Sequence, residues 1–135
     1  MTNEMKPDAY DLEERTALFG EAVIDFCLRL PTTPVTSPLI TQFVKAGTSI
    51  GANYGEADEA ESKADFRHKI AICRKETRES KHWCRMLAKA CVSEAEALRE
   101  LWKEVHELHL IFCKIIRTTD ANLRRERAAK KLSLR

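Results

Sequence analysis

Glu79-Ser-Lys-His82 is the stretch of this sequence whose residue types and spacing could most directly do chemistry. On a helix, an E-x-x-H motif places a carboxylate and an imidazole on one face, and di-iron carboxylate bundles use that motif twice, with two further glutamates. His106 and His109 could supply a second ligand pair, but neither has a glutamate three residues before it. Two histidines without a third ligand form a weak metal site. We therefore expect no metal site, no cofactor and a solvated side chain at His82.

Other catalytic patterns are missing from the sequence. It contains no G-x-S-x-G, no P-loop and no strand followed by G-x-G-x-x-G. The carboxylate pairs Glu13-Glu14 and Glu59/Glu61 fall in polar stretches, where we expect them to be solvated. The cysteines, an odd number without a C-x-x-C pair, fall within helical patterns, where a free thiol packs as a small hydrophobe; they are Cys27, Cys73, Cys84, Cys91 and Cys113. The sequence predicts a protein that is not an enzyme.

Helical periodicity runs through most of the chain, and no stretch alternates as a strand does. The prolines stand at positions 7, 31, 34 and 38, so none breaks a helix after Pro38. Cap signals mark three helix starts: Ser37-Pro38, Ser62 with Asp65, and Ser93 with Glu96. We predict an all-α fold, an up-down-up-down antiparallel four-helix bundle, with helices at about 11–30, 37–57, 62–91, and 94–118 or longer.

The third predicted helix has two apolar faces. Its core seam alternates steps of three and four along Phe66, Ile70, Cys73, Thr77, Ser80, Cys84, Leu87 and Cys91. A second stripe, Ile72, Trp83, Met86 and Ala90 with Glu76 and Glu79 between them, lies about 100° away around the helix. This stripe predicts either a broad face that contacts two neighbours within one bundle or a subunit interface anchored by Trp83.

The segment "GTSIGANYGEADEAES", residues 47–62, holds three of the four glycines. No strand precedes it, so a phosphate-binding loop is the least favoured interpretation. Its small side chains predict the close approach of another helix, with Gly55 at the helix end. Ser49 and Asn53, one turn apart, are the expected hydrogen-bond donors to Glu76 or Glu79 if those carboxylates are buried.

Positive charge is concentrated at the end of the chain. The formal net charge is only +2, yet residues 117–135 hold seven Lys or Arg against Asp120 and Glu126. The candidate nucleic-acid-binding residues are Arg117, Arg124, Arg125, Arg127, Lys130, Lys131 and Arg135. We divide the chain into a disordered tail at 1–9, a bundle at 10–118 and a basic tail at 119–135, which either continues as a solvated helix or frays. Without a secretory signal or a membrane-spanning run, a cytoplasmic location is expected.

Three motifs in order resemble the bacterial four-helix-bundle family named for 23S rRNA intervening sequences. Members typically show T-S-I-x-A-N-x-x-E, then D-F at the start of the third helix, then K-E-x-x-E-x-x-x-W along it. The matching residues include Ser49, Asn53 and Glu56 in the first motif, Asp65 and Phe66 in the second, and Glu76, Glu79 and Trp83 in the third. The match covers roughly 39–87. Gly51 and Tyr54-Gly55 depart from the common pattern and predict a looser end of the second helix.

The resemblance implies a four-helix bundle that assembles into a ring-shaped homopentamer. One branch of the family serves diversity-generating retroelements and binds reverse transcriptase and RNA through a basic surface, whereas the role of most members is unknown. We therefore expect a non-enzymatic homo-oligomer that acts as a scaffold or adaptor for RNA or an RNA-handling protein. The alternative is a protein-protein interaction module or regulator that binds no nucleic acid.

Overall fold

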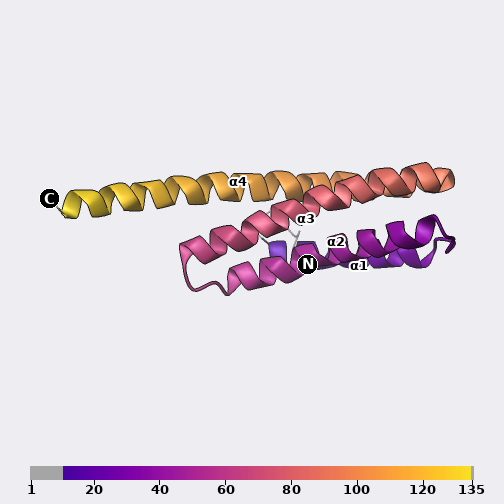
Figure 1. Ribbon diagram of the computed structural model, residues 1–135, viewed down its shortest axis with the longest axis horizontal. Helices are drawn as coiled ribbons and strands as arrows, with labels where there is room; N and C mark the ends of the chain where they lie inside the picture. Colours follow the sequence, from indigo (N-terminus) through magenta and orange to yellow (C-terminus); the bar gives the residue numbers. More distant parts are fainter. Residues whose placement is uncertain (1–10, 135) are drawn as a thin grey trace, which may run out of the picture.

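The structure, a computed structural model, describes residues 11–134 of the chain. Within these residues the backbone forms four α-helices: α1 (Leu12–Leu28), α2 (Thr36–Asp58), α3 (Lys63–Ala90) and α4 (Ala95–Ser133). A short 3-10 turn, η1 (Val92–Glu94), links α3 to α4, and the described part of the chain contains no strand. The helices follow one another up and down (Figure 1), which confirms the predicted all-α bundle. The predicted tail at 1–9 and the candidate Arg135 lie outside the described residues.

The starts of α2 and α3 are set by hydroxyl side chains. Ser62 Oγ accepts a hydrogen bond from the backbone N–H of Asp65 at 3.0 Å, so the cap predicted for α3 is confirmed. α2 begins at Thr36, one residue before the predicted start at residue 37, but Ser37 does not cap it. Thr33 Oγ1 instead accepts from the backbone N–H of Thr36 at 3.1 Å, and Pro34 follows it directly. The cap-then-proline pattern is therefore present at Thr33-Pro34, where the missing proline N–H costs nothing.

The capping box predicted at Ser93 and Glu96 is also wrong. α4 begins at Ala95 after Glu94, whose side chain makes no capping hydrogen bond. The chain turns through η1, closed by a hydrogen bond from the backbone N–H of Glu94 to the carbonyl oxygen of Cys91 at 2.9 Å. Ser93 lies inside this turn rather than ahead of a helix, and so it cannot act as the cap.

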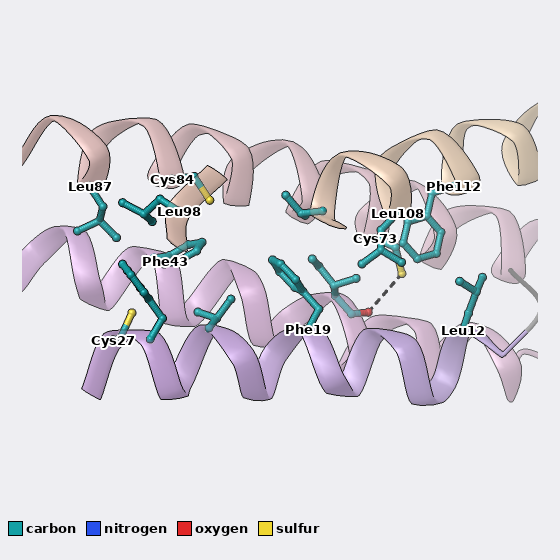
Figure 2. Close-up of a cluster of buried hydrophobic side chains, with 14 of the residues drawn as sticks. Leu12, Phe19, Cys27, Phe43, Cys73, Cys84, Leu87, Leu98, Leu108 and Phe112 are labelled. Atoms are coloured by element: carbon teal, nitrogen blue, oxygen red, sulfur yellow. Dashed lines mark hydrogen bonds between the residues drawn. The ribbon is translucent and has the colours of Figure 1, made fainter. Parts of the chain in front are cut away.

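The core lies between all four helices, and it confirms the predicted seam of α3. Figure 2 shows Phe19 of α1, Phe43 of α2 and Phe112 of α4 pointing into it. The buried residues of α3 are Ile70, Cys73, Thr77, Ser80, Cys84 and Leu87. The Cys73 thiol also donates a hydrogen bond to the carbonyl oxygen of Ile50 at 3.6 Å (dashed in Figure 2), which ties α3 to α2.

The small residues of α2 allow α1 to pack closely against it. A Cβ atom added at Gly47 would lie 2.9 Å from Cγ2 of Val23, and one at Gly51 would lie 3.2 Å from Oγ1 of Thr16. Gly55, in contrast, has open space around it and lies inside α2, which runs on to Asp58. The prediction that α2 ends at Gly55 is therefore wrong, whereas the predicted close helix approach is confirmed. The looser end of α2 stays a prediction.

α4 is longer than the bundle that it completes. Residues 119–133 continue the helix, with Thr119 still buried. Arg67 near the start of α3 pairs with Asp120 at 2.9 Å, and Lys63 in the first turn of α3 pairs with Glu126. The C-terminal end of α4 extends past the other helices (Figure 1). No helix within the described residues combines the length and the hydropathy that a membrane span requires.

Candidate nucleic-acid interface

The residues that suggested metal chemistry are dispersed over α3 and α4. His82 is exposed, and its ring lies edge-on to Trp83 with 4.8 Å between the ring centroids. His106 and His109 lie on α4, where they face α3. Among residues 11–134, no three His, Cys, Asp or Glu side chains lie together as a metal ion would require.

The hydrogen bonds of His109 indicate which ring nitrogen carries the proton when the ring is neutral. Thr77 Oγ1 uses its single proton to bond the carbonyl oxygen of Arg74 at 2.6 Å. His109 Nδ1, 3.0 Å from the same Oγ1, must therefore be the N–H donor of that pair. His109 Nε2 is left as an acceptor, and Cys113 Sγ lies 3.5 Å from it.

The electrostatic surroundings of His109 agree with this hydrogen bonding. Burial lowers the pKa of His109 below its usual value, and the charges of Lys81 and His106 lower it further. At neutral pH the His109 ring therefore adds no full charge to this surface. The cations around it are the groups that can attract anions.

The buried cysteines offer no nucleophile. Burial raises the pKa of the Cys73 and Cys84 thiols to about 12, and that of Cys27 to about 11. Because the thiolate is the reactive form, these thiols are inert at neutral pH and contribute packing.

The hydrogen bonds predicted from Ser49 and Asn53 to Glu76 or Glu79 are not formed. Ser49 Oγ donates to the carbonyl oxygen of Lys45 at 2.6 Å, and Asn53 Nδ2 donates to that of Ser49 at 2.9 Å. Both bonds stay within α2. The condition for the predicted pairing fails because Glu76 and Glu79 keep contact with solvent. Partial burial and the charge of Glu79 nevertheless raise the pKa of Glu76 above its usual value.

The remaining motif residues lie in an ion pair, in the first turn of a helix or against the core. Glu56 pairs with Lys69 at 2.5 Å across the α2–α3 connection, and Asp65 lies in the first turn of α3. Phe66 and Trp83 are half-buried and pack against the core of their own chain. The Trp83 indole nitrogen is buried and has no hydrogen-bond partner among the described residues. Trp83 therefore fits the interpretation of a broad face within one bundle, and the subunit-interface alternative remains a prediction.

The predicted basic residues of α4 are all exposed, and the hollow of about 590 Å³ that four of them border has walls only from residues 124–134. Five of them occupy the last part of α4 and its extension beyond Lys63–Glu126: Arg124, Arg125, Arg127, Lys130 and Lys131. Arg117 is separated from them and lies about two turns before Arg124 on α4. They present charge on a single projecting helix.

A second cationic surface, which sequence reasoning missed, runs along α3. Arg74, Arg78, Lys81 and Arg85 follow one another at steps of four, three and four residues, which places them on one face of the helix. We call this set the α3 basic stripe. None of its members forms an ion pair with any residue in 11–134, whereas Arg67 and Lys69 just before it are both paired.

The α3 basic stripe borders a groove between α3 and α4. One hollow of about 530 Å³ has Arg85, Leu98, Arg99, Trp102 and Lys103 in its walls. A second of about 450 Å³ has Arg74, Lys75, Arg78, His109 and Cys113 in its walls. Between the two, Lys81 Nζ lies 3.1 Å from His106 Nδ1. We call the two hollows and this contact the α3–α4 groove.

A ladder of rings lines the α4 side of the groove. Trp102 stacks on His106 with 4.8 Å between centroids and 13° between planes, and His106 lies 6.5 Å from His109 at 10°. Lys81 Nζ lies 5.6 Å from the centroid of Trp102, within the range of a cation–π interaction. The spacing of the stripe on α3 could have been read from the sequence. Its position opposite Trp102 depends on the register between two helices, which the sequence does not show.

Comparison with known proteins agrees with the bundle. A family model described as 23S rRNA-intervening sequence protein matches residues 11–114. Among solved structures, the chain is similar to the crystal structure of a protein of unknown function from the S23 ribosomal protein family of Bacteroides thetaiotaomicron. The TM-score is 0.69 at 27% sequence identity, over 78% of this chain and 97% of that one. No curated protein matches the chain.

The family match spans the helices α1, α2 and α3 and the first half of α4, and so includes every motif on which the resemblance was based. This chain therefore belongs to the family of 23S rRNA-intervening sequence proteins.

Proposed function

We propose that this protein is a non-enzymatic helical bundle that assembles with copies of itself in the cytoplasm and acts as a scaffold or adaptor for RNA. The observation that carries the proposal is the set of cations on α3 and α4 that form no ion pair with an acidic residue within 11–134. Lysine and arginine side chains of this kind bind phosphates and release counterions from nucleic acids.

Self-assembly would multiply the charge of a single chain. A pentamer, the state implied by the family resemblance, would present five α3 basic stripes and five α4 ends to one RNA. Since phosphate binding strengthens with the number of contacts, a modest net charge of +2 per chain is compatible with RNA binding by the assembly. Partly exposed apolar residues are available for contacts between chains, among them Ile24 and Leu28 of α1, at 39% and 79% exposure.

Light scattering and RNA binding by the purified full chain test the two halves of the proposal separately. We expect a mass of five chains, and a monomer at micromolar concentration would refute self-assembly. We also expect retention of RNA on a native gel in 50 mM salt and its release at high salt, whereas no retention at low salt would refute the RNA-binding half. A protein that co-purifies after nuclease treatment and washing in high salt would favour the alternative of a protein-protein module.

A further inference from the structure

Trp102 is partly exposed in the α3–α4 groove. His106 stacks on its ring, and Lys81 Nζ lies 5.6 Å from the ring centroid. Trp102 also forms part of the wall of the hollow of about 530 Å³, whose other walls come from the first turns of α4 and from the last turns of α3. Trp102 is 39% exposed although an indole of this size gains free energy from burial. A flat apolar surface at the end of a ring stack is thus open to a ligand.

Cations surround this surface on the α3 side. Arg85 shares the hollow with Trp102, and Lys81, Arg78 and Arg74 continue the α3 basic stripe toward the second hollow. Neither hollow has an aspartate or glutamate in its walls. From Arg74 to Arg85 the stripe extends about 16 Å, at 1.5 Å per residue. The groove therefore combines one stacking surface with a line of positive charge.

We propose that the α3–α4 groove binds single-stranded RNA, with a base stacked on Trp102 and the backbone phosphates along the α3 basic stripe. This inference rests on the RNA binding proposed above and assigns its selectivity to one surface. Proteins that hold single strands pair an electropositive groove with aromatic side chains on which bases stack. The bases of a duplex are already stacked on one another and cannot lie against Trp102.

The projecting end of α4 has a different role in this arrangement. Its five exposed cations, Arg124, Arg125, Arg127, Lys130 and Lys131, have no aromatic ring of Trp, Tyr or Phe among them in the sequence. They can contact phosphates of a single strand or of a duplex alike. They therefore add affinity without distinguishing the two forms.

The groove also stays clear of the surface predicted for subunit contacts. Arg78 and Trp83 lie five positions apart on α3, which corresponds to about 140° around the helix at 3.6 residues per turn. A partner subunit on the Trp83 stripe would leave the α3 basic stripe accessible to RNA.

Fluorescence anisotropy with a labelled single strand and a duplex of the same length tests the inference on the full chain. For the wild type we expect tighter binding of the single strand by about tenfold, in line with one stacked base. Trp102→Leu should remove most of that preference and leave the salt dependence of single-strand binding unchanged. Arg74→Gln/Arg78→Gln should weaken single-strand binding and reduce the slope of log K against log salt by about 1.4, at 0.7 for each lost phosphate contact.

The matched control is Arg124→Gln/Arg127→Gln, which removes the same charge from the end of α4. It should weaken both RNA forms by the same factor and preserve the preference. If the preference survives Trp102→Leu and the groove double variant, or is lost in the control, the groove assignment is overturned while RNA binding stands. If the wild type binds neither RNA form at low salt, the proposed function fails together with the groove assignment. Circular dichroism of each variant checks that the exposed substitutions leave the bundle folded.

Discussion

Gly47 and Gly55 lie two turns apart on α2 and have opposite surroundings. At Gly47, a methyl group would press against all three carbons of the Val23 side chain, with Cγ2 at 2.9 Å. Val23 is fully buried and stiff at χ1, so it cannot move aside without cost. At Gly55, no atom lies within 4 Å of the added Cβ. The same substitution should therefore have opposite effects at the two positions.

We predict that Gly47→Ala lowers the free energy of unfolding by about 1 kcal/mol, because overpacking of about 1–3 kcal/mol exceeds the gain in helix propensity. Gly55→Ala should raise it by about 0.5–1 kcal/mol, since only the propensity gain applies. Urea denaturation followed by circular dichroism measures both. Equal effects of the two substitutions would contradict the close approach of α1 to Gly47.

His109 makes the stability of the bundle depend on pH. Its pKa in the folded protein lies below the value of about 6.5 expected in the unfolded chain, mainly because of burial and then because of Lys81 and His106. The stabilising contribution is therefore complete above pH 6.5 and is lost as the pH falls through the folded pKa. Protonation would also convert Nε2 from an acceptor of the Cys113 thiol into a donor.

We predict that the free energy of unfolding falls less steeply between pH 7 and pH 5 in His109→Gln than in the wild type. His82→Gln, at an exposed position of α3, is the matched control. Urea titrations at fixed ionic strength over this range give the slopes. A slope that is identical in His109→Gln and the wild type would refute the buried neutral histidine.

At the scale of the elements, Arg15 of α1 supplies the ion pairs that join α1 to α4 within the described residues. α1 packs closely on α2 but meets α4 along a much shorter contact. Arg15 bonds both carboxylate oxygens of Glu104, at 2.8 and 2.9 Å, and a third bond reaches Glu107 at 2.7 Å. The hydrogen bonds to Glu104 raise the pKa of Arg15 above its usual value, and the bond to Glu107 raises it further. The paired, half-buried Glu104 should contribute more than Glu107, whose side chain is 65% exposed.

We predict that Glu104→Gln lowers the free energy of unfolding by about 1 kcal/mol and Glu107→Gln by less than about 0.5 kcal/mol. Both losses should shrink in 1 M NaCl, which screens the exposed ends of the pairs. Denaturation curves at low and high salt give these values. A larger loss for Glu107→Gln would show that the geometry of the Arg15 pairs is wrong.

The sequence was sufficient for the helices and for most of their bounds, but insufficient for two of the groups that cap them. Periodicity placed the core seam of α3 correctly because burial imposes the same spacing on every turn. Before α2, the sequence offered rival hydroxyls, and Thr33 Oγ1 rather than that of Ser37 accepts the hydrogen bond from the first backbone N–H of the helix, that of Thr36. Ser93 and Glu96 match the capping-box pattern, but Ser93 lies within the 3-10 turn between α3 and α4 and therefore does not cap α4. Which side chain caps a helix depends on how the neighbouring helices position the connecting segment. A local sequence motif does not contain this information.

The candidate site was predicted less fully than the fold, for a related reason. The basic residues of the α4 end follow one another in sequence and were identified by counting charges. The α3–α4 groove joins Arg78 and Arg85 of α3 to Trp102 of α4, and these lie close only because Thr77 is opposite His109. That register between two helices is a property of the packed bundle, so a count along one chain segment could not have found the groove.

For the molecule as a whole, the length of α4 separates a structural part from a projecting part. Ile116 and Thr119 are buried, and Asp120 pairs with Arg67, so the bundle uses α4 at least to this turn. After the exposed pair Lys63–Glu126, the remaining helical residues project by about 10 Å, at 1.5 Å per residue. Their composition favours a helix without packing, because Ala, Lys, Arg and Leu have high helix propensity.

Two truncations should therefore differ in their effect on stability. Deletion of residues 128–135 should leave the free energy of unfolding within about 0.5 kcal/mol of the wild type, since no buried side chain of the described bundle is removed. Deletion of residues 118–135 should lower it by about 1 kcal/mol or more, because it exposes Ile116 and removes Thr119 from the core. Thermal and urea denaturation of both truncated chains give the comparison. A loss of stability in the shorter deletion would mean that the end of α4 packs against another surface, and the most direct source of one is a second copy of the chain in the assembly proposed above.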